Sequence, residues 1–106
     1  MILEFNALEL SQRLAQPNPP AIIDVRESDE YEYAHIDGTQ LKPLGDIEQW
    51  AAELDREAEY VLMCHSGARS GQATGYLQSL GFKRVFNLRG GIDAWSRLVD
   101  SSIPRY

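Results

Sequence analysis

Short apolar runs alternate with amphipathic stretches along the chain. The runs at 21–25, 60–63 and 85–88 are apolar at nearly every position, as in parallel strands that are buried on both faces. The stretches between them place apolar residues at helical spacing. This alternation predicts an α/β sandwich with a mostly parallel sheet. The expected elements are a helix over 7–16, a strand over 21–25, a helical turn over 30–33, a short strand over 40–42, a helix that holds Ile47 to Leu54, a strand over 60–63, a helix over 70–80, a strand over 85–88 and a last helix that contains Ile92 and Trp95.

Capping signals mark several of the expected helix ends. Asn6 followed by Glu9 is typical of a capping box that starts the first helix. Ser28 is the expected cap of the helical turn, and Asp46 is the expected N-cap of the next helix. Gly81 is expected to end the helix after that, because glycine adopts the left-handed conformation that closes many helices.

The length and composition are those of one ordinary globular domain. The chain has 106 residues, of which 43% are hydrophobic and 25% charged, so we expect a single domain over 1–106 with its own core. One cysteine cannot form an internal disulfide, and two histidines far apart in the sequence give no metal-ligand spacing. We therefore expect neither a metal nor another cofactor. The lone thiol indicates a reducing compartment or a reactive role, and the two are compatible.

The net charge of −6 narrows the range of partners. A negative chain is poorly suited to nucleic acid and to anionic membrane surfaces, so neither is expected as a partner. The residues from Met1 to Phe5 lack the basic flank and long apolar run of a signal peptide. No stretch approaches the roughly 18 apolar residues that span a bilayer. These features predict a cytoplasmic protein.

The strongest chemical signal is the loop from Cys64 to Arg69, between a predicted strand and a predicted helix. In open parallel sheets, sites lie at the carboxyl ends of the strands, which is where Cys64 is expected. N–H groups of such a loop and of the following helix can point at the sulfur, and together with the helix dipole they stabilise a thiolate. A lowered thiol pKa makes the cysteine nucleophilic near neutral pH, and the same cradle would hold a charged Cys–S–S⁻ persulfide. The alternative is that Cys64 packs as a small buried hydrophobe.

The other loop residues have distinct expected roles. Gly67 supplies backbone angles that a tight loop needs, and Ala68 stays small at the rim. Arg69 is permanently charged and either braces the loop or binds an anionic donor, and both roles stay open. His65 is expected to face solvent and to tune substrate entry. His35, outside the loop, is expected to make structural hydrogen bonds.

A set of segments from Ile22 to Tyr106 carries a family pattern. The segments are Ile23-Asp24-Val25-Arg26-Glu27, Glu30-Tyr31, His35-Ile36-Asp37-Gly38, Cys64-x-x-Gly67-x-Arg69-Ser70, Gly81-Phe82, Val85-x-Asn87-Leu88-x-Gly90-Gly91-Ile92-x-Ala94-Trp95 and Pro104-Arg105-Tyr106. In this order they resemble the rhodanese domains. The sequence departs from that pattern at Ala34, where a glycine is usual, and at Thr39-Gln40-Leu41-Lys42, which is less apolar.

The resemblance implies a three-layer sandwich with a five-stranded, mostly parallel sheet flanked by helices. It also implies a sulfurtransferase of the thiosulfate:cyanide type that works through a cysteine persulfide. By position, Cys64 would be the sulfur-accepting nucleophile. The substrate-binding loop around it would comprise His65, Ser66, Gly67, Ala68, Arg69 and Ser70. The partners would be a small anionic sulfur donor such as thiosulfate and an acceptor that is a thiol, cyanide or a protein.

Two other functions compete with enzymatic sulfur transfer. Protein tyrosine phosphatases and their relatives carry Cys-x5-Arg loops, whereas four residues separate Cys64 from Arg69, a tighter ring suited to one sulfane sulfur atom. Phosphatase chemistry also needs a general acid, for which the sequence offers no candidate. The alternative from a different class is a non-enzymatic sulfur-relay or protein-binding module. The intact cysteine loop favours catalysis over that alternative.

An anionic donor has to be reconciled with the negative net charge. We expect a local positive mouth formed by Arg69 together with Arg26, Lys42 and Arg89. Acidic residues around Cys64 would instead favour a protein or thiol acceptor that carries positive charge. Asp24 and Arg26, which follow a predicted strand, are expected to pair with each other or with nearby loops.

Overall fold

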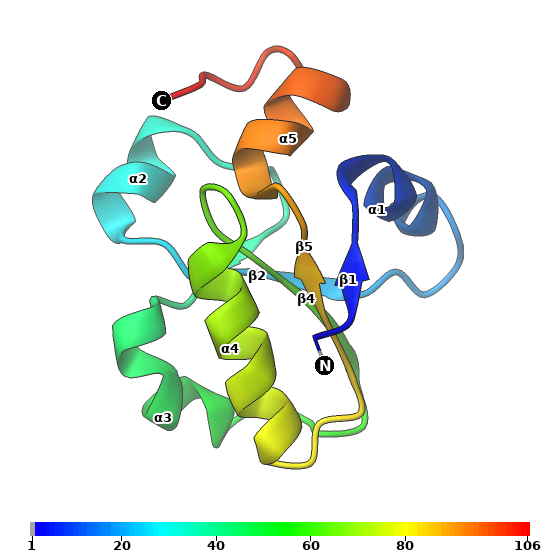
Figure 1. Cartoon of the computed structure of the whole chain (residues 1–106), viewed down its shortest axis with the longest axis vertical. Coiled ribbons are helices and arrows are strands. Elements are labelled where there is room, and N and C mark those ends of the chain that lie inside the picture. The colour runs from blue at the N-terminus through cyan, green and yellow to red at the C-terminus, as the bar shows by residue number, and fades with distance from the viewer. Residues whose placement is uncertain (1) are drawn as a thin grey trace.

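Five parallel strands form the centre of the structure, a computed structural model that describes residues 2–106 (Figure 1). Helices pack on both faces of this sheet. The predicted α/β sandwich with a five-stranded sheet is therefore confirmed, and every strand pairing is parallel. In chain order the elements are β1 (Glu4–Phe5), α1 (Ala7–Leu14), β2 (Ala21–Asp24), α2 (Ser28–Tyr33), β3 (Gln40–Leu41), the 3-10 turn η1 (Leu44–Asp46), α3 (Ile47–Ala51), β4 (Glu59–Met63), α4 (Ala68–Ser79), β5 (Arg84–Leu88) and α5 (Gly91–Leu98).

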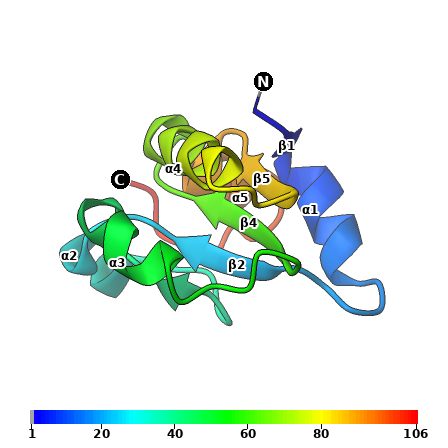
Figure 2. The same ribbon diagram turned by 90° about the horizontal axis from the view of Figure 1, so that it is seen from below.

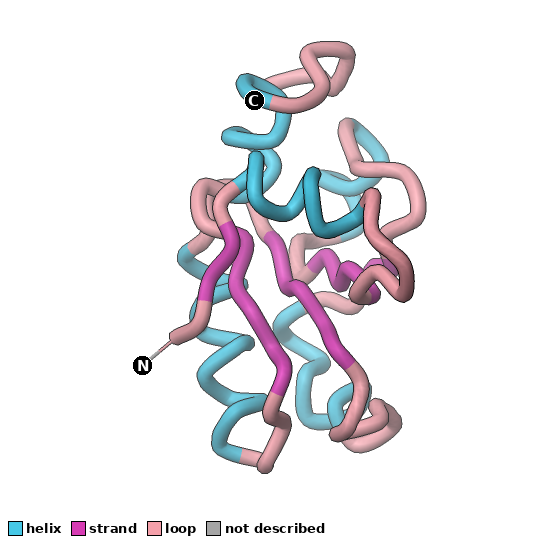
Figure 3. The backbone as a smooth tube through the Cα atoms, turned by 90° about the vertical axis from the view of Figure 1, so that its right-hand side faces the viewer, coloured by secondary structure: helices cyan, strands magenta, loops and turns pink. Residues whose placement is uncertain are grey.

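The strand order places β4 at the centre of the sheet. The order is β1-β5-β4-β2-β3, so β4 pairs with β2 on one side and β5 on the other. Figure 3 shows the strands in magenta, with helices around them. Met63 of β4 lies beside Asp24 of β2, and Leu62 lies beside Asn87 of β5. The carboxyl ends of these three strands therefore reach one edge of the sheet. Cys64, the residue after β4, lies at that edge.

Alternate residues of β4 face two separate cores. Val61 and Met63 pack in a core with α1 and α5, whereas Leu62 and Cys64 pack in a core with α3 and α4. This follows from the pleat of a strand, which directs successive side chains to opposite faces. Figure 2, which views the molecule from below, shows α4 running along one face of the sheet. The sulfur of Cys64 consequently belongs to the α4 side.

The hydrophobic pattern does not predict β1. Its two residues pair with Asn87 and Leu88 at the outer side of β5. Phe5 packs against Phe86 with ring centroids 4.7 Å apart. A strand of two residues is too short to show alternation, so the pairing depends on tertiary contacts that a sequence pattern does not display.

Some of the expected helix ends are confirmed and others are wrong. The capping box is present: the Glu9 N–H donates to Asn6 Oδ1 over 2.8 Å, and the Asn6 N–H donates to Glu9 Oε1 over 2.8 Å. The first helix ends at Leu14, before the expected residue 16. Ser28 does not cap α2, because it is already the first helical residue and Glu27 is the N-cap.

The start of α4 also differs from the expectation. The helix begins at Ala68 and not at residue 70, so Ala68 and Arg69 belong to its first turn and Gly67 is the N-cap. The last loop residues are therefore held by the helix itself. At 12 residues, α4 is the longest helix within residues 2–106, and none in that range has the length and apolar character needed to cross a membrane.

The fold accommodates both departures from the rhodanese pattern. Ala34 adopts an extended backbone with φ −158° and ψ 133°, which any residue can take, so a glycine is not needed there. The less apolar segment still forms β3, in which Gln40 pairs with Ile23 and Leu41 with Asp24. The edge position of β3 suits its polar residues because one side of the strand is unpaired.

Candidate active site

Three hydrogen-bond donors converge on the sulfur of Cys64. The backbone N–H groups of Gly67 and Ser70 point at Sγ from 3.1 and 3.4 Å, and Ser70 Oγ lies 3.3 Å away. The side chain is buried, with 1% of its surface exposed. A cysteine that packed only as a small hydrophobe would have no need of these donors, so the geometry is that of an anion cradle.

The surroundings lower the pKa of the Cys64 thiol. Burial is the largest single influence and acts to raise this pKa, because a thiolate loses solvation in the interior. Hydrogen bonds from the Ser70 hydroxyl and from the N–H groups of Ser70, Gly67 and Ser66 act in the other direction. Together they outweigh burial, and the net shift of the pKa is downward. The cradle therefore favours the thiolate, which is the nucleophilic form.

The N-terminus of α5 holds the loop in this shape. The N–H of Ile92 donates to the Cys64 carbonyl over 2.9 Å, and the N–H of Asp93 donates to the His65 carbonyl over 3.1 Å. Because the carbonyls of the loop turn outward to meet these donors, its N–H groups are left facing the sulfur. Gly91 lies against the same carbonyls: a Cβ atom there would come within 2.4 to 2.6 Å of the Cys64 and His65 backbone.

A polar chain leads from the sulfur to the edge strand β1. The Ser70 hydroxyl contacts Asn87 Oδ1, and Asn87 Nδ2 donates to Glu4 Oε2 over 3.0 Å and to the Gly67 carbonyl over 3.2 Å. Ser70 and Asn87 are buried. No role for Asn87 or Glu4 was predicted from the sequence. The available signal was the single polar residue inside the otherwise apolar run Val85–Leu88.

Comparison with known proteins places this arrangement in a family. A model described as "Rhodanese-like domain" matches residues 6–98, which include the whole cysteine loop. The chain belongs to the rhodanese-like domain family. The predicted resemblance is thereby confirmed.

Several relatives of this rhodanese-like domain are named for sulfur chemistry. The chain is 39% identical in sequence to the sulfurtransferase of Allochromatium vinosum, over 92% of this chain and 91% of that protein. It is 39% identical to the putative sulfur carrier protein YrkF of Bacillus subtilis, over 90% of this chain and 51% of that protein. The crystal structure of a rhodanese-like domain protein from Staphylococcus aureus superposes with a TM-score of 0.85, at 26% identity and 99% coverage of both chains. The chain thus spans about a third to a half of some curated relatives and nearly all of others.

Arg69 of the rhodanese-like domain is engaged by a carboxylate. Its Nη1 and Nη2 donate to the two oxygens of Glu30 over 2.7 and 2.9 Å, in a bidentate pair with α2. The pair raises the pKa of Arg69 and lowers the pKa of Glu30 to about 2. Of the two roles left open for Arg69, bracing the loop is the one that these contacts support.

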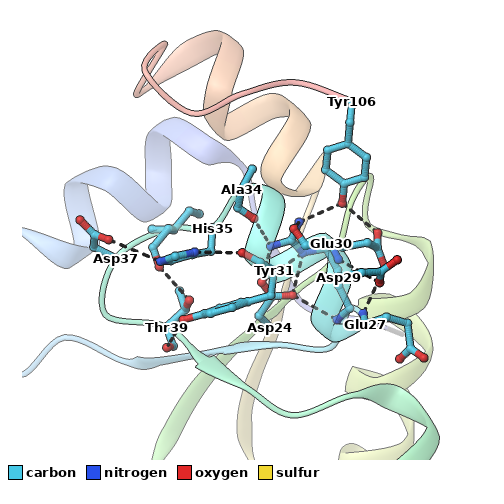
Figure 4. A network of polar contacts seen from close by, with 12 residues as sticks. Asp24, Glu27, Asp29, Glu30, Tyr31, Ala34, His35, Asp37, Thr39 and Tyr106 are labelled. Atoms are coloured by element: carbon cyan, nitrogen blue, oxygen red, sulfur yellow. Dashed lines mark hydrogen bonds and ion pairs between the residues drawn. The ribbon is translucent and has the colours of Figure 1, made fainter.

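Arg26 does not belong to the positive mouth that was expected around the loop, so the prediction is wrong for this residue. Arg26 is fully buried, and its guanidinium donates to both oxygens of Asp24 and, over 2.7 Å, to the Ala34 carbonyl. Its Nη1 also donates to the Tyr106 hydroxyl over 2.9 Å, and that hydroxyl donates to Glu30 Oε2 over 2.8 Å (Figure 4). Arg26 therefore anchors α2 and the final residue to the sheet and presents no charge to solvent. The expected pairing with Asp24 is confirmed.

The two histidines differ in how they match expectation. His65 is not simply solvent-facing: it is half-buried, its ring centroid lies 4.2 Å from that of Tyr106, and its Nδ1 is buried with no hydrogen-bond partner among residues 2–106. His35 makes the structural contacts expected of it, with Nδ1 3.0 Å from the Tyr31 carbonyl and its ring stacked on Tyr31 (Figure 4). The remaining loop residues Ser66 and Ala68 are exposed at the rim.

Replacement of Glu30 by glutamine is expected to cost about 1 kcal/mol at pH 7, a modest value because Arg69 is 37% exposed and solvent screens the pair. The pKa of Glu30 in the folded protein lies below its ordinary value of 4.5, so its contribution is present above pH 4.5 and is lost as the pH falls toward 2. Urea unfolding of wild type and Glu30→Gln at pH 7, 4 and 2.5 measures this. The difference between them should shrink with falling pH.

Glu32→Gln is the matched control for this prediction. Glu32 lies on the same helix, is exposed and loses the same charge on substitution. Its effect on stability should be small at every pH. A Glu30→Gln difference that stayed constant from pH 7 to 2.5 would contradict the assigned role of the Glu30–Arg69 pair.

Proposed function

We propose that this rhodanese-like domain is a sulfurtransferase in which Cys64 accepts a sulfane sulfur from a small anionic donor such as thiosulfate. The observation that carries the proposal is the convergence of the Gly67 N–H, the Ser70 N–H and the Ser70 hydroxyl on Sγ at the start of α4. A cradle of this kind stabilises negative charge on sulfur without a metal. The names of the relatives support the same chemistry.

The proposed reaction has two steps. The Cys64 thiolate attacks the outer sulfur of thiosulfate, a new S–S bond forms, and the old S–S bond breaks with its electron pair leaving on sulfite. The product is a persulfide whose negative charge lies on the terminal sulfur. A nucleophilic acceptor then attacks that terminal sulfur and restores the Cys64 thiolate. In this scheme the loop from His65 to Ser70 surrounds the transferred atom, and its N–H groups stabilise the charge throughout.

The charges near the loop favour a thiol or protein as the natural acceptor. Arg69 and Arg26, two of the cations expected at the mouth, are neutralised by Glu30 and Asp24. The adjacent helix α2 carries further acidic residues, and its last residue, Tyr33, packs edge-on against Tyr106 with both rings exposed. Carboxylates and aromatic rings suit a partner that carries positive charge. Cyanide then serves as an acceptor in the assay.

The single thiol and the negative net charge also bear on the compartment and the partners of the domain. We propose that residues 1–106 act as one domain, in a reducing compartment such as the cytoplasm, because the single thiol has to stay unoxidised to react. The negative net charge disfavours nucleic acid and anionic membranes as partners.

Mass spectrometry after incubation with thiosulfate tests the proposal. Folded, reduced wild type is expected to gain the mass of one sulfur atom and to lose it on addition of cyanide. Cys64→Ser, shown by circular dichroism to be folded, is expected to gain nothing. The proposal fails if wild type gains no sulfur from thiosulfate or from any other sulfane donor. A persulfide that forms but passes to neither cyanide nor a small-molecule thiol would contradict the enzyme and favour a sulfur-relay module that transfers only to a partner protein.

A further inference from the structure

The Ser70 hydroxyl lies between two acceptors and has one hydrogen to give. Its oxygen is 3.3 Å from Cys64 Sγ and in hydrogen-bond contact with Asn87 Oδ1. A serine hydroxyl donates one hydrogen bond and can accept others. Ser70 and Asn87 are buried, with 0% and 4% of their surface exposed. Bulk water therefore cannot replace a hydrogen bond that the Ser70 hydroxyl gives up. The hydroxyl therefore serves either the sulfur or Asn87 at any moment.

The orientation of the Asn87 amide is determined by its neighbours. Nδ2 donates to Glu4 Oε2 over 3.0 Å and to the Gly67 carbonyl over 3.2 Å, and neither of those oxygens can donate in return. Turning the amide would set its oxygen against both acceptors. Oδ1 is therefore held toward Ser70 as an acceptor. This arrangement ties β1 to the active-site loop through one side chain.

The two acceptors compete differently in each state of the sulfur. In the neutral thiol, S–H donates to Ser70 Oγ while the hydroxyl donates to Asn87 Oδ1, and both bonds are made. In the thiolate, the proton has left to solvent and the hydroxyl turns to Sγ, which leaves buried Oδ1 without its donor. In the persulfide, the charge has moved to the terminal sulfur, so the hydroxyl is free to return to Asn87.

We infer that Asn87 is a positioning residue that draws the Ser70 hydroxyl away from Sγ whenever Sγ carries no negative charge. It favours the neutral thiol over the thiolate. It also favours sulfur loading, a part of the inference that rests on the proposed persulfide chemistry, because the attack removes charge from Sγ. Ser70 and Asn87 thus have opposite effects on the thiolate, although they are hydrogen-bonded to each other.

Opposite shifts of the thiol pKa test the inference without any sulfur transfer. The rate of Cys64 alkylation by iodoacetamide is measured against pH for wild type, Ser70→Ala, Asn87→Leu and the double variant. Ser70→Ala should raise the pKa by about one unit, whereas Asn87→Leu should lower it by about half a unit to one unit. In the Ser70→Ala background, Asn87→Leu should have no effect, because the hydroxyl through which it acts is gone.

The double-variant comparison also controls for neighbouring charges. The charged or titratable groups around the loop are Arg69 on α4, Glu30 on α2, Glu4 on β1, the Asp24–Arg26 pair, Asp93 on α5, His65 and Tyr106. Any change in their influence when Asn87 is replaced appears in both backgrounds and cancels. Ser96→Ala removes a buried hydroxyl on α5 that donates to the Ile103 carbonyl, and it should leave the thiol pKa unchanged.

Several outcomes would overturn the inference. If Asn87→Leu raises the pKa, or shifts it equally with and without Ser70, Asn87 acts only as a structural support. Should the leucine variant fail to fold, Asn87→Ala removes the same acceptor with a smaller side chain and is judged by the same comparison.

The amount of persulfide at equilibrium is a second test of the inference. At a set ratio of thiosulfate to sulfite, Asn87→Leu should hold about three- to tenfold less persulfide than wild type, as the loss of one hydrogen bond implies. An unchanged amount would overturn the loading part of the inference. If wild type forms no persulfide at all, the proposed function fails while the alkylation profiles still decide the role of Asn87.

Discussion

Replacement of Gly91 by alanine is expected to destabilise the domain by roughly 3 kcal/mol or more and to prevent sulfur loading of Cys64. Gly91 has φ +59°, a left-handed conformation that costs other residues about 1 to 2 kcal/mol. The added Cβ would also lie 2.4 to 2.6 Å from backbone atoms of Cys64 and His65, which have no flexible end to move. The N-terminus of α5 would have to withdraw from the loop.

The functional loss follows from the hydrogen bonds at that contact. Withdrawal of α5 breaks the hydrogen bonds from the Ile92 and Asp93 N–H groups to the carbonyls of Cys64 and His65. Without these bonds the loop is no longer held with its N–H groups directed at the sulfur. Urea unfolding and the thiosulfate mass assay measure the two effects. Gly45→Ala is the control, because a Cβ there meets nothing within 4 Å and the substitution should change stability by less than about 0.5 kcal/mol. Equal behaviour of the two variants would show that the docking of α5 is unimportant.

Replacement of Asp24 by leucine is expected to destabilise the domain by about 3 to 5 kcal/mol, because it leaves the buried Arg26 guanidinium without its counter-charge. Arg26 is entirely enclosed, and Asp24 binds it through both carboxylate oxygens, the shortest contact being 2.7 Å. A change of this size is a large part of the stability of a domain of this length. Chemical denaturation gives the magnitude.

A double variant separates charge from packing. Asp24→Leu combined with Arg26→Met removes both charges and should recover part of the loss, since a buried ion pair is often replaceable by apolar residues of similar volume. Asp93→Asn, which breaks an exposed pair with Arg105, should have a much smaller effect than Asp24→Leu. If the double variant is less stable than the single one, the loss does not come from an uncompensated charge.

The features predicted correctly from the sequence are those that depend on residues close to one another along the chain. The runs that became β2, β4 and β5 are apolar at nearly every position, and the capping box of α1 joins residues three positions apart. The cradle around Cys64 could be anticipated for the same reason, because its donors come from residues within six positions of the cysteine. Local spacing was enough to indicate its chemistry.

The features that were missed join residues distant in the sequence. Arg69 meets Glu30 across 39 positions, Arg26 meets Tyr106 across 80, and Asn87 meets Glu4 across 83. Which of these side chains meet depends on the strand order, and a pattern of hydrophobic and polar residues does not specify that order. The expected positive mouth failed for this reason: the sequence shows the arginines but does not show that Asp24 and Glu30 pair with Arg26 and Arg69.

The enclosure of Sγ has a consequence for how a partner distinguishes an empty domain from a loaded one. With 1% of its surface exposed, Cys64 is withdrawn below the rim formed by Ser66 and Ala68. A persulfide would extend the side chain by one S–S bond, about 2 Å, toward that rim. The atom offered to an acceptor is then the transferred sulfur, which lies nearer the rim than the Sγ atom that carries it. A bulky acceptor would therefore meet a loaded domain more readily than an empty one, whose Sγ is left to small molecules such as thiosulfate.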